Sequence, residues 1–150
     1  MRFLGIVVLF AVISSCPAVI LTDYTRCESH GTINSILFEP CQKEPCHVQG
    51  SQNYTAQVNF TAHEHSMTLE NIYHGFFAGV QVPFEVNPKD ACTDSGIHCP
   101  LIPGESHVYV ANVTIPAYAT SVGMRLAGQW EVRDDTGHNL MCFVFPLILT

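Results

Sequence analysis

The sequence has few basic residues for its length. Only six of its 150 residues are lysine or arginine, against 13 aspartates and glutamates, and the formal net charge at pH 7 is −7. Proteins that bind nucleic acids need a basic stripe or patch to neutralise phosphates. This composition excludes that class, and we expect no nucleic-acid partner.

No apolar run is long enough to span a bilayer, which takes about 20 residues. The run at residues 3–13 follows Arg2 and precedes small residues. This is the order found in a secretory signal peptide. We predict that residues 1–18 are a signal peptide cleaved after Ala18, and that residues 19–150 form the mature domain. The protein is then secreted, or delivered to the lysosomal lumen.

Catalytic motifs are missing as well. There is no G-x-S-x-G nucleophile motif, and the carboxylates are scattered along the chain. The segment HEH at residues 63–65 would place two imidazoles on one face of a strand, which is a metal-site geometry. No third ligand can be named, so we interpret it as a polar strand end. We expect no enzyme, no cofactor and no metal.

The cysteines number seven, and Cys16 would leave with the signal peptide. An even set remaining in a secreted chain predicts a disulfide framework. The segment CTDSGIHC at residues 92–99 holds four side chains that can all bind zinc. The oxidising compartment favours a loop closed by a disulfide over a zinc site. The remaining six are Cys27, Cys41, Cys46, Cys92, Cys99 and Cys142.

Alternation of apolar and polar residues is the dominant pattern, and it predicts half-buried strands over residues 54–62, 107–115 and 122–132. Less regular apolar segments at 33–38, 72–84 and 140–149 also predict strands. The apolar sides of the three regular strands hold Tyr54, Ala56, Val58, Phe60 and Ala62; Tyr109, Ala111, Val113 and Ile115; and Val122, Met124, Leu126, Gly128, Trp130 and Val132.

Turn signals separate these segments. The sequence DDTG at residues 134–137 is typical of a hairpin turn, and residues 87–104 are rich in proline and glycine. About seven strands at this spacing predict an all-β fold, an antiparallel β-sandwich in one domain.

Three N-x-T glycosylation sequons begin at Asn53, Asn59 and Asn112. Asn59 and Asn112 lie on the polar sides of their predicted strands. Because glycans need water, the sequons and the alternation indicate the same outer face.

The order of motifs resembles a known family. It runs C-x13-C-x4-C, then HG-x3-G-V-x-V-P-F, then C-x6-CP, a tryptophan on a strand, a DD turn and a final C-x3-P. This resembles the Niemann–Pick type C2 proteins of the ML lipid-recognition superfamily, over residues 27–146. The resemblance implies an immunoglobulin-like sandwich whose sheets part at one end, with an apolar cavity between them. It also implies the disulfides Cys27–Cys142, Cys41–Cys46 and Cys92–Cys99.

The function implied by the resemblance is lipid binding and transport. A fatty acid, a sterol or a semiochemical would lie between the sheets and pass to a membrane or receptor, and we expect a monomer. Phe84 and Val82 would line the mouth, Phe38 one wall, the Trp130 strand the opposite wall, and Tyr118 would match an aromatic at the mouth. With the inward faces above, the ligand-binding set is Phe38, Val58, Phe60, Val82, Phe84, Tyr109, Val113, Tyr118, Val122, Met124, Leu126 and Trp130.

Two departures from the sterol carriers favour a broader choice of lipid, such as fatty acids. In the segment GVQVPF, Gln81 replaces the usual first proline, and the loop between Cys92 and Cys99 is one residue longer. The alternative function is an innate-immunity module that docks on a receptor when loaded with microbial lipid. That function would favour basic residues at the mouth, and only Lys89 lies near it.

Overall fold

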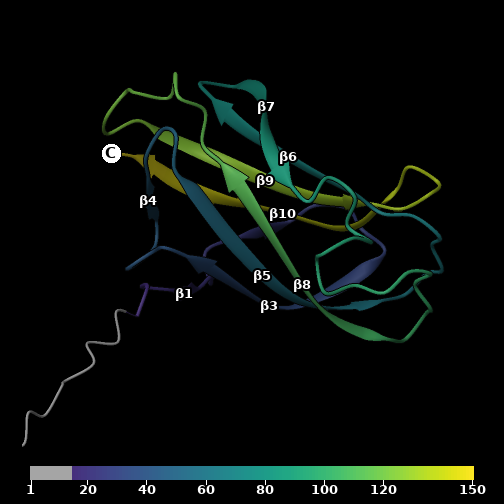
Figure 1. The fold of residues 1–150 in the computed structure, drawn as a ribbon. Coiled ribbons are helices and arrows are strands. Elements are labelled where there is room, and N and C mark those ends of the chain that lie inside the picture. Colours follow the sequence, from purple (N-terminus) through teal and green to yellow (C-terminus); the bar gives the residue numbers. More distant parts are fainter. Residues whose placement is uncertain (1–14) are drawn as a thin grey trace, which may run out of the picture.

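Ten strands make up the regular structure within residues 15–150, which are the residues that the computed structural model describes (Figure 1). Most of the predicted signal peptide, residues 1–14, lies outside the described residues. Residues 15–18 are exposed, and the first strand begins at Val19. Within the described part of the chain, no helix is long and apolar enough to cross a membrane.

Seven of the strands are long, which confirms the prediction of an all-β sandwich. They are β3 (Gly31–Glu39), β5 (Asn53–Ala62), β6 (Glu70–Phe77), β7 (Val80–Asn87), β8 (Ser106–Thr114), β9 (Arg125–Arg133) and β10 (Asn139–Leu149). Three short strands complete the sheets: β1 (Val19–Ile20), β2 (Thr25–Arg26) and β4 (Cys46–Val48).

The strands form two layers that share β7. One layer runs β1-β3-β5-β8, and the other contains β6, β9 and β10, with β2 and β4 beside β10. Strand β7 pairs with β6 through residues 80–84 and with β8 through residues 85–87. This change of partner carries β7 from one layer to the other, and Figure 1 shows it crossing between them. All pairings are antiparallel except β4 with β10.

The predicted alternation on β5 and β8 is confirmed. The apolar sides of both strands are buried between the layers, and the polar sides face outward. Asn53, Asn59 and Asn112 are all exposed on this outer face. Burial of one face fixes the register, because a slip by one residue would expose the whole apolar set.

The prediction of a single strand over residues 72–84 is wrong. A two-residue turn divides the segment into β6 and β7, and Phe77 pairs with Val80 across it. Both turn residues have positive φ, 48° at Ala78 and 81° at Gly79, as tight hairpin turns require. The sequence hides this turn because Ala78 is a residue that rarely adopts positive φ.

The prediction that Val122 and Met124 point inward is also wrong. Strand β9 begins only at Arg125, and Gly123 has a φ of 83° in the preceding turn. The amide of Gly123 donates to the carbonyl of Leu149 at 2.6 Å, and that bond fixes the turn outside the strand ladder. Val122 is 77% exposed and Met124 36% exposed.

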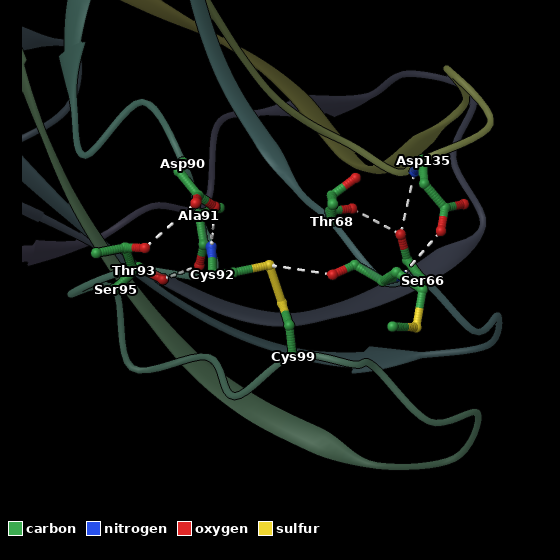
Figure 2. The surroundings of a disulfide bond; sticks show 10 residues. Ser66, Thr68, Asp90, Ala91, Cys92, Thr93, Ser95, Cys99 and Asp135 are labelled. Carbon is green, nitrogen blue, oxygen red and sulfur yellow. Dashed lines mark hydrogen bonds between the residues drawn. A yellow bond between two sulfur atoms is a disulfide. The ribbon is translucent and has the colours of Figure 1, made fainter.

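Three disulfides close the fold, and they are the pairs that the family resemblance implies: Cys27–Cys142, Cys41–Cys46 and Cys92–Cys99. The segment CTDSGIHC is therefore a clipped loop. Figure 2 shows how the clip is held: Asp90 accepts hydrogen bonds from the Cys92 amide at 2.8 Å and the Thr93 hydroxyl at 3.2 Å. Residues 66–68 lie between the disulfide and the β9–β10 turn (Figure 2): the Asp135 amide donates to the Ser66 hydroxyl at 3.1 Å, and the Met67 amide donates to Oδ2 of Asp135 at 2.8 Å.

Candidate functional site

Aromatic side chains meet where the two layers face each other. Phe38 of β3 and Phe145 of β10 contact edge to face, with ring centroids 5.1 Å apart. Tyr109 of β8 and Trp130 of β9 do the same at 6.4 Å. Such pairs contribute about 0.5–1.5 kcal/mol each beyond the area they bury. The layers are therefore in direct contact here, and any molecule placed between them would have to displace these rings.

Most of the predicted ligand-binding residues come together in this interior. Val82 is half-buried and packs against the same core, whereas Tyr118, Val122 and Met124 lie on the surface. The buried members of the predicted set are Phe38, Val58, Phe60, Phe84, Tyr109, Val113, Leu126 and Trp130.

One polar bridge joins the layers inside this apolar region. The indole Nε1 of Trp130 donates to the Tyr109 hydroxyl at 2.9 Å, and that hydroxyl donates to Oδ1 of Asn71. Asn71 in turn donates to the carbonyl of Pro88 at 2.6 Å. Burial raises the pKa of Tyr109 despite these hydrogen bonds, so the phenol stays neutral. The bridge holds β6, β8 and β9 together at this point.

A pair of glycines makes room for two further rings. Gly75 and Gly128 face each other on β6 and β9. A Cβ at position 75 would overlap the Phe84 ring, and one at position 128 would overlap the Tyr73 hydroxyl. Because neither glycine carries a side chain, the Phe84 ring and the Tyr73 side chain occupy the space over them, and the two ring centroids are 5.4 Å apart.

Tyr73 is a site residue that the sequence patterns did not single out. Its strand alternates in burial, with Asn71, Tyr73 and Gly75 buried on one side. That alternation was present, but the opposite side of the strand is not clearly polar, because it carries Ile72 and Phe76.

The change of partner by β7 opens a hollow in the wall beside these rings. Strand β7 pairs with β6 at Phe84 and Tyr73, and the chain meets β6 again where the Asn71 amide donates to the carbonyl of Lys89 at 2.8 Å. Between these points residues 85–87 pair with β8 instead. The hollow, here called the β6–β7 gap, has a volume of about 450 Å³. Residues 70–74, residues 83–86, Lys89 and Arg133 line it.

A second hollow lies on the other side of β7, with a volume of about 410 Å³. Tyr118, Pro116 and Ile115 line it from the β8–β9 loop, and Pro83 and Glu85 line it from β7. The structure thus brings Tyr118 next to β7, although the residue is 65% exposed. Pro83 and Glu85 separate this hollow from the β6–β7 gap.

The site combines a charged rim with an apolar interior. The β6–β7 gap leads from a rim with two carboxylates and two cations, Glu70, Glu85, Lys89 and Arg133, to the buried rings of Tyr73 and Phe84. Across residues 15–150, no group of three or more histidine, cysteine or acidic side chains is placed to hold a metal. The segment HEH directly follows β5, which ends at Ala62, and this agrees with its interpretation as a polar strand end.

Comparison with known proteins gives consistent matches along the chain. Residues 22–149 match the family described as the ML domain. A protein of Danio rerio named NPC intracellular cholesterol transporter 2 is 33% identical over 97% of this chain and 95% of its own length. The Bos taurus protein of that name is 29% identical over 98% and 97%. A crystal structure of a Niemann-Pick type C2 protein from Japanese carpenter ant has a TM-score of 0.72 at 23% identity, covering 85% of this chain and 98% of that one.

Proposed function

Because the chain belongs to the ML domain family, we propose that it binds and transports a fatty acid, a sterol or a similar hydrophobic ligand between its two β-layers. The observation that carries the proposal is the buried aromatic interior next to the β6–β7 gap. The names of the two relatives, cholesterol transporters, support it. No bond is made or broken in this function, and the protein acts by shielding the ligand from water.

Burial of the ligand supplies the affinity. Each CH₂ group removed from water contributes about 0.8 kcal/mol, so an acyl chain of about 16 carbons gains roughly 12 kcal/mol. Association and the ordering of side chains offset much of this gain. Separating the aromatic pairs between the layers adds a further cost, because their contacts are lost. We expect micromolar to submicromolar dissociation constants.

Entry through the β6–β7 gap fits the geometry. Phe84 lies at the inner end of the gap and covers Gly75. Because the Phe84 ring only packs over Gly75 and forms no hydrogen bond, it can rotate away without leaving a polar group unpaired. We propose that the ligand enters beside Phe84 and Val82, and that the walls are the buried residues of β3, β5, β8 and β9.

Secretion and glycosylation complete the proposal. The three disulfides fit an extracellular or lumenal compartment. We propose that residues 1–18 are removed and that Asn53, Asn59 and Asn112 carry glycans. These asparagines lie on the outer face of β5 and β8, so their glycans would leave the gap free.

Hand-off of the ligand requires a surface next to the site. Tyr118, Val122 and Met124 are exposed on the β8–β9 loop. Tyr118 also lines the hollow on the other side of β7 from the β6–β7 gap. Figure 1 shows this loop at the end of the sandwich that holds the β6–β7 turn. We propose that a monomer presents this end to an acceptor membrane or receptor. Recognition of phosphorylated microbial lipids is less favoured, because the rim of the gap carries as many carboxylates as cations.

The experiment is displacement of a fluorescent fatty acid by oleate and by cholesterol. We expect Phe84→Asp to abolish probe binding, since a carboxylate would lie at the inner end of the gap. The matched control is Val108→Asp, which places the same charge at an exposed position of β8. Wild-type affinity in folded Phe84→Asp protein, or equal loss in both variants, would contradict the proposed site.

A further inference from the structure

Tyr73 has a hydroxyl group that is buried between the layers without a partner. The residue is 1% exposed, and among residues 15–150 no donor or acceptor forms a hydrogen bond with its oxygen. Burying a hydroxyl without a hydrogen bond is costly, and folded proteins rarely leave one unpaired. Burial also raises the pKa of Tyr73 above its ordinary value, so the group keeps its proton and can donate it.

A second tyrosine in the same core shows the usual arrangement. The Tyr109 hydroxyl accepts from Trp130 and donates to Asn71, so both of its hydrogen-bonding roles are filled. The two tyrosines contact the same indole, with centroids 5.0 Å from Trp130 to Tyr73 and 6.4 Å to Tyr109. The core can therefore satisfy a phenol, and Tyr73 differs from its neighbour in having no such partner.

The surroundings of the Tyr73 oxygen are apolar. Tyr73 pairs with Trp130, and its hydroxyl lies over Gly128, two residues closer to the start of β9. A side-chain methyl carbon of Leu147 lies close to the same point, and the Phe84 ring packs beside it. A water molecule would need about two to four polar partners to be held there. These neighbours supply almost none besides the phenol.

We propose that the Tyr73 hydroxyl donates a hydrogen bond to a neutral oxygen atom on the buried part of the bound lipid. The inference rests on the proposed function and deepens it by naming the ligand class: an aliphatic lipid with a carbonyl, ester or hydroxyl oxygen within its buried part. The cations that line the gap, Lys89 and Arg133, lie at its rim. A carboxylate beside Tyr73 would therefore be a buried charge without a cation to pair with. A neutral oxygen carries no such cost, and the Tyr73 hydroxyl can supply its hydrogen bond.

The location of Tyr73 indicates where along the ligand this oxygen lies. Tyr73 lines the inner end of the β6–β7 gap, whose rim carries Glu70 and Lys89. A lipid whose charged head stays at that rim presents a middle segment of its chain to Tyr73. The Tyr73 hydroxyl then selects for an oxygen at one region of the chain rather than at the head.

The test uses octadecanoic acid and a series of octadecanoic acids that carry one keto group at successive positions. Dissociation constants are measured by displacement of a fluorescent fatty acid from the full-length mature protein. For wild-type protein and for Tyr73→Phe, the affinity of each keto acid is divided by that of octadecanoic acid. At one or two neighbouring positions we expect this ratio to fall about tenfold in Tyr73→Phe. Octadecanoic acid itself should bind both proteins equally well.

The matched control is Tyr24→Phe, which removes a tyrosine hydroxyl from a ring that packs against Phe143 and belongs to none of the strands proposed as walls. The control should leave the ratios unchanged. An equal ratio in wild type and Tyr73→Phe at every position would overturn the inference while leaving lipid binding intact. Failure of wild type to bind any of the acids, or the sterol of the earlier experiment, would overturn the proposed function and the inference with it.

A second measurement needs no ligand. Replacing Tyr73 by phenylalanine removes a hydroxyl without a protein partner, so the unfolding midpoint in urea should stay the same or rise. A fall as large as that of Tyr109→Phe would show that the hydroxyl has a protein partner in solution, and would overturn the inference.

Discussion

Gly75 and Gly128 lie directly opposite each other on β6 and β9, inside the sandwich. The rings of Phe84 and Tyr73 occupy the space that two side chains would otherwise fill. This glycine pair allows two large rings to lie against the sheet at the inner end of the β6–β7 gap. The site at which we propose that lipid enters therefore depends on the absence of side chains at positions 75 and 128.

Gly128→Ala should lower the free energy of unfolding by about 1–3 kcal/mol, because the added methyl overlaps the Tyr73 side chain. The same substitution in a Tyr73→Val background should cost much less, since the smaller side chain leaves room for it. Urea unfolding of the four proteins measures the coupling between the two positions. Equal costs in both backgrounds would show that Tyr73 is not the group that excludes a side chain at 128.

Tyr109→Phe should lower the free energy of unfolding by about 1–3 kcal/mol, because the Trp130 indole and the Asn71 side chain both lose a buried partner. The change leaves the ring and its packing in place. Chemical denaturation compares this variant with wild type. A stability within a few tenths of a kcal/mol of wild type would mean that the bridge between the layers contributes little.

Asp134→Ala should destabilise the protein by about 1–2 kcal/mol at neutral pH. Burial raises the pKa of Asp134, but hydrogen bonds from the Thr136 hydroxyl and from the amides of His138 and Thr136 outweigh it, and the pKa lies below its ordinary value. A lowered pKa stabilises the folded state above the unfolded pKa, and the effect is lost as pH falls through the folded pKa.

The difference between wild type and Asp134→Ala should therefore shrink as the pH falls below about 4. Thermal unfolding across this range measures it, and Asp23→Ala at an exposed position is the control. A difference that stays constant down to the lowest pH would show that the carboxylate charge is not the source of the stabilisation.

The disulfides should differ in their effect on stability. Cys27 and Cys142 are 115 residues apart in sequence, whereas Cys41 and Cys46 are five apart. By the entropy of loop closure, replacing the first pair by serines should cost about 4.7 kcal/mol and replacing the second about 2 kcal/mol. Unfolding in guanidinium chloride compares the two double variants. The order of the two losses would be reversed if native strain or residual structure in the unfolded chain outweighed loop closure.

The sequence patterns predicted the strands that have one solvent-exposed face and one buried face. On β5 and β8 the alternation is regular, because outward residues such as Asn59 and Asn112 face water. The segment at 72–84 lacks such contrast, and its turn at Ala78 and Gly79 was missed.

The sequence predicted most of the buried residues of the site, but only part of how they are arranged. Phe84, Trp130 and Tyr109 were placed in the interior, as the structure has them. The role of Tyr73 depends on Gly128, 55 positions away in a strand whose register is set by pairing across the sheet. Alternation in one strand carries no information on such a pairing, and so the unpartnered hydroxyl could not be foreseen. For Val122 and Met124 the error is different: the sequence alternation extends into the turn that precedes β9, so it predicted inward positions for residues outside the strand.

The central claim is that lipid binds between the two layers, and the single tryptophan of the chain tests it directly. Trp130 is fully buried there, between Tyr73, Tyr109 and Phe143. Bromine quenches indole fluorescence on contact, so the measurement is titration of the protein with a fatty acid brominated in mid-chain. We predict saturable quenching of Trp130 that the unbrominated acid reverses. Stoichiometric binding of the brominated acid without any quenching would place the ligand elsewhere and contradict the account.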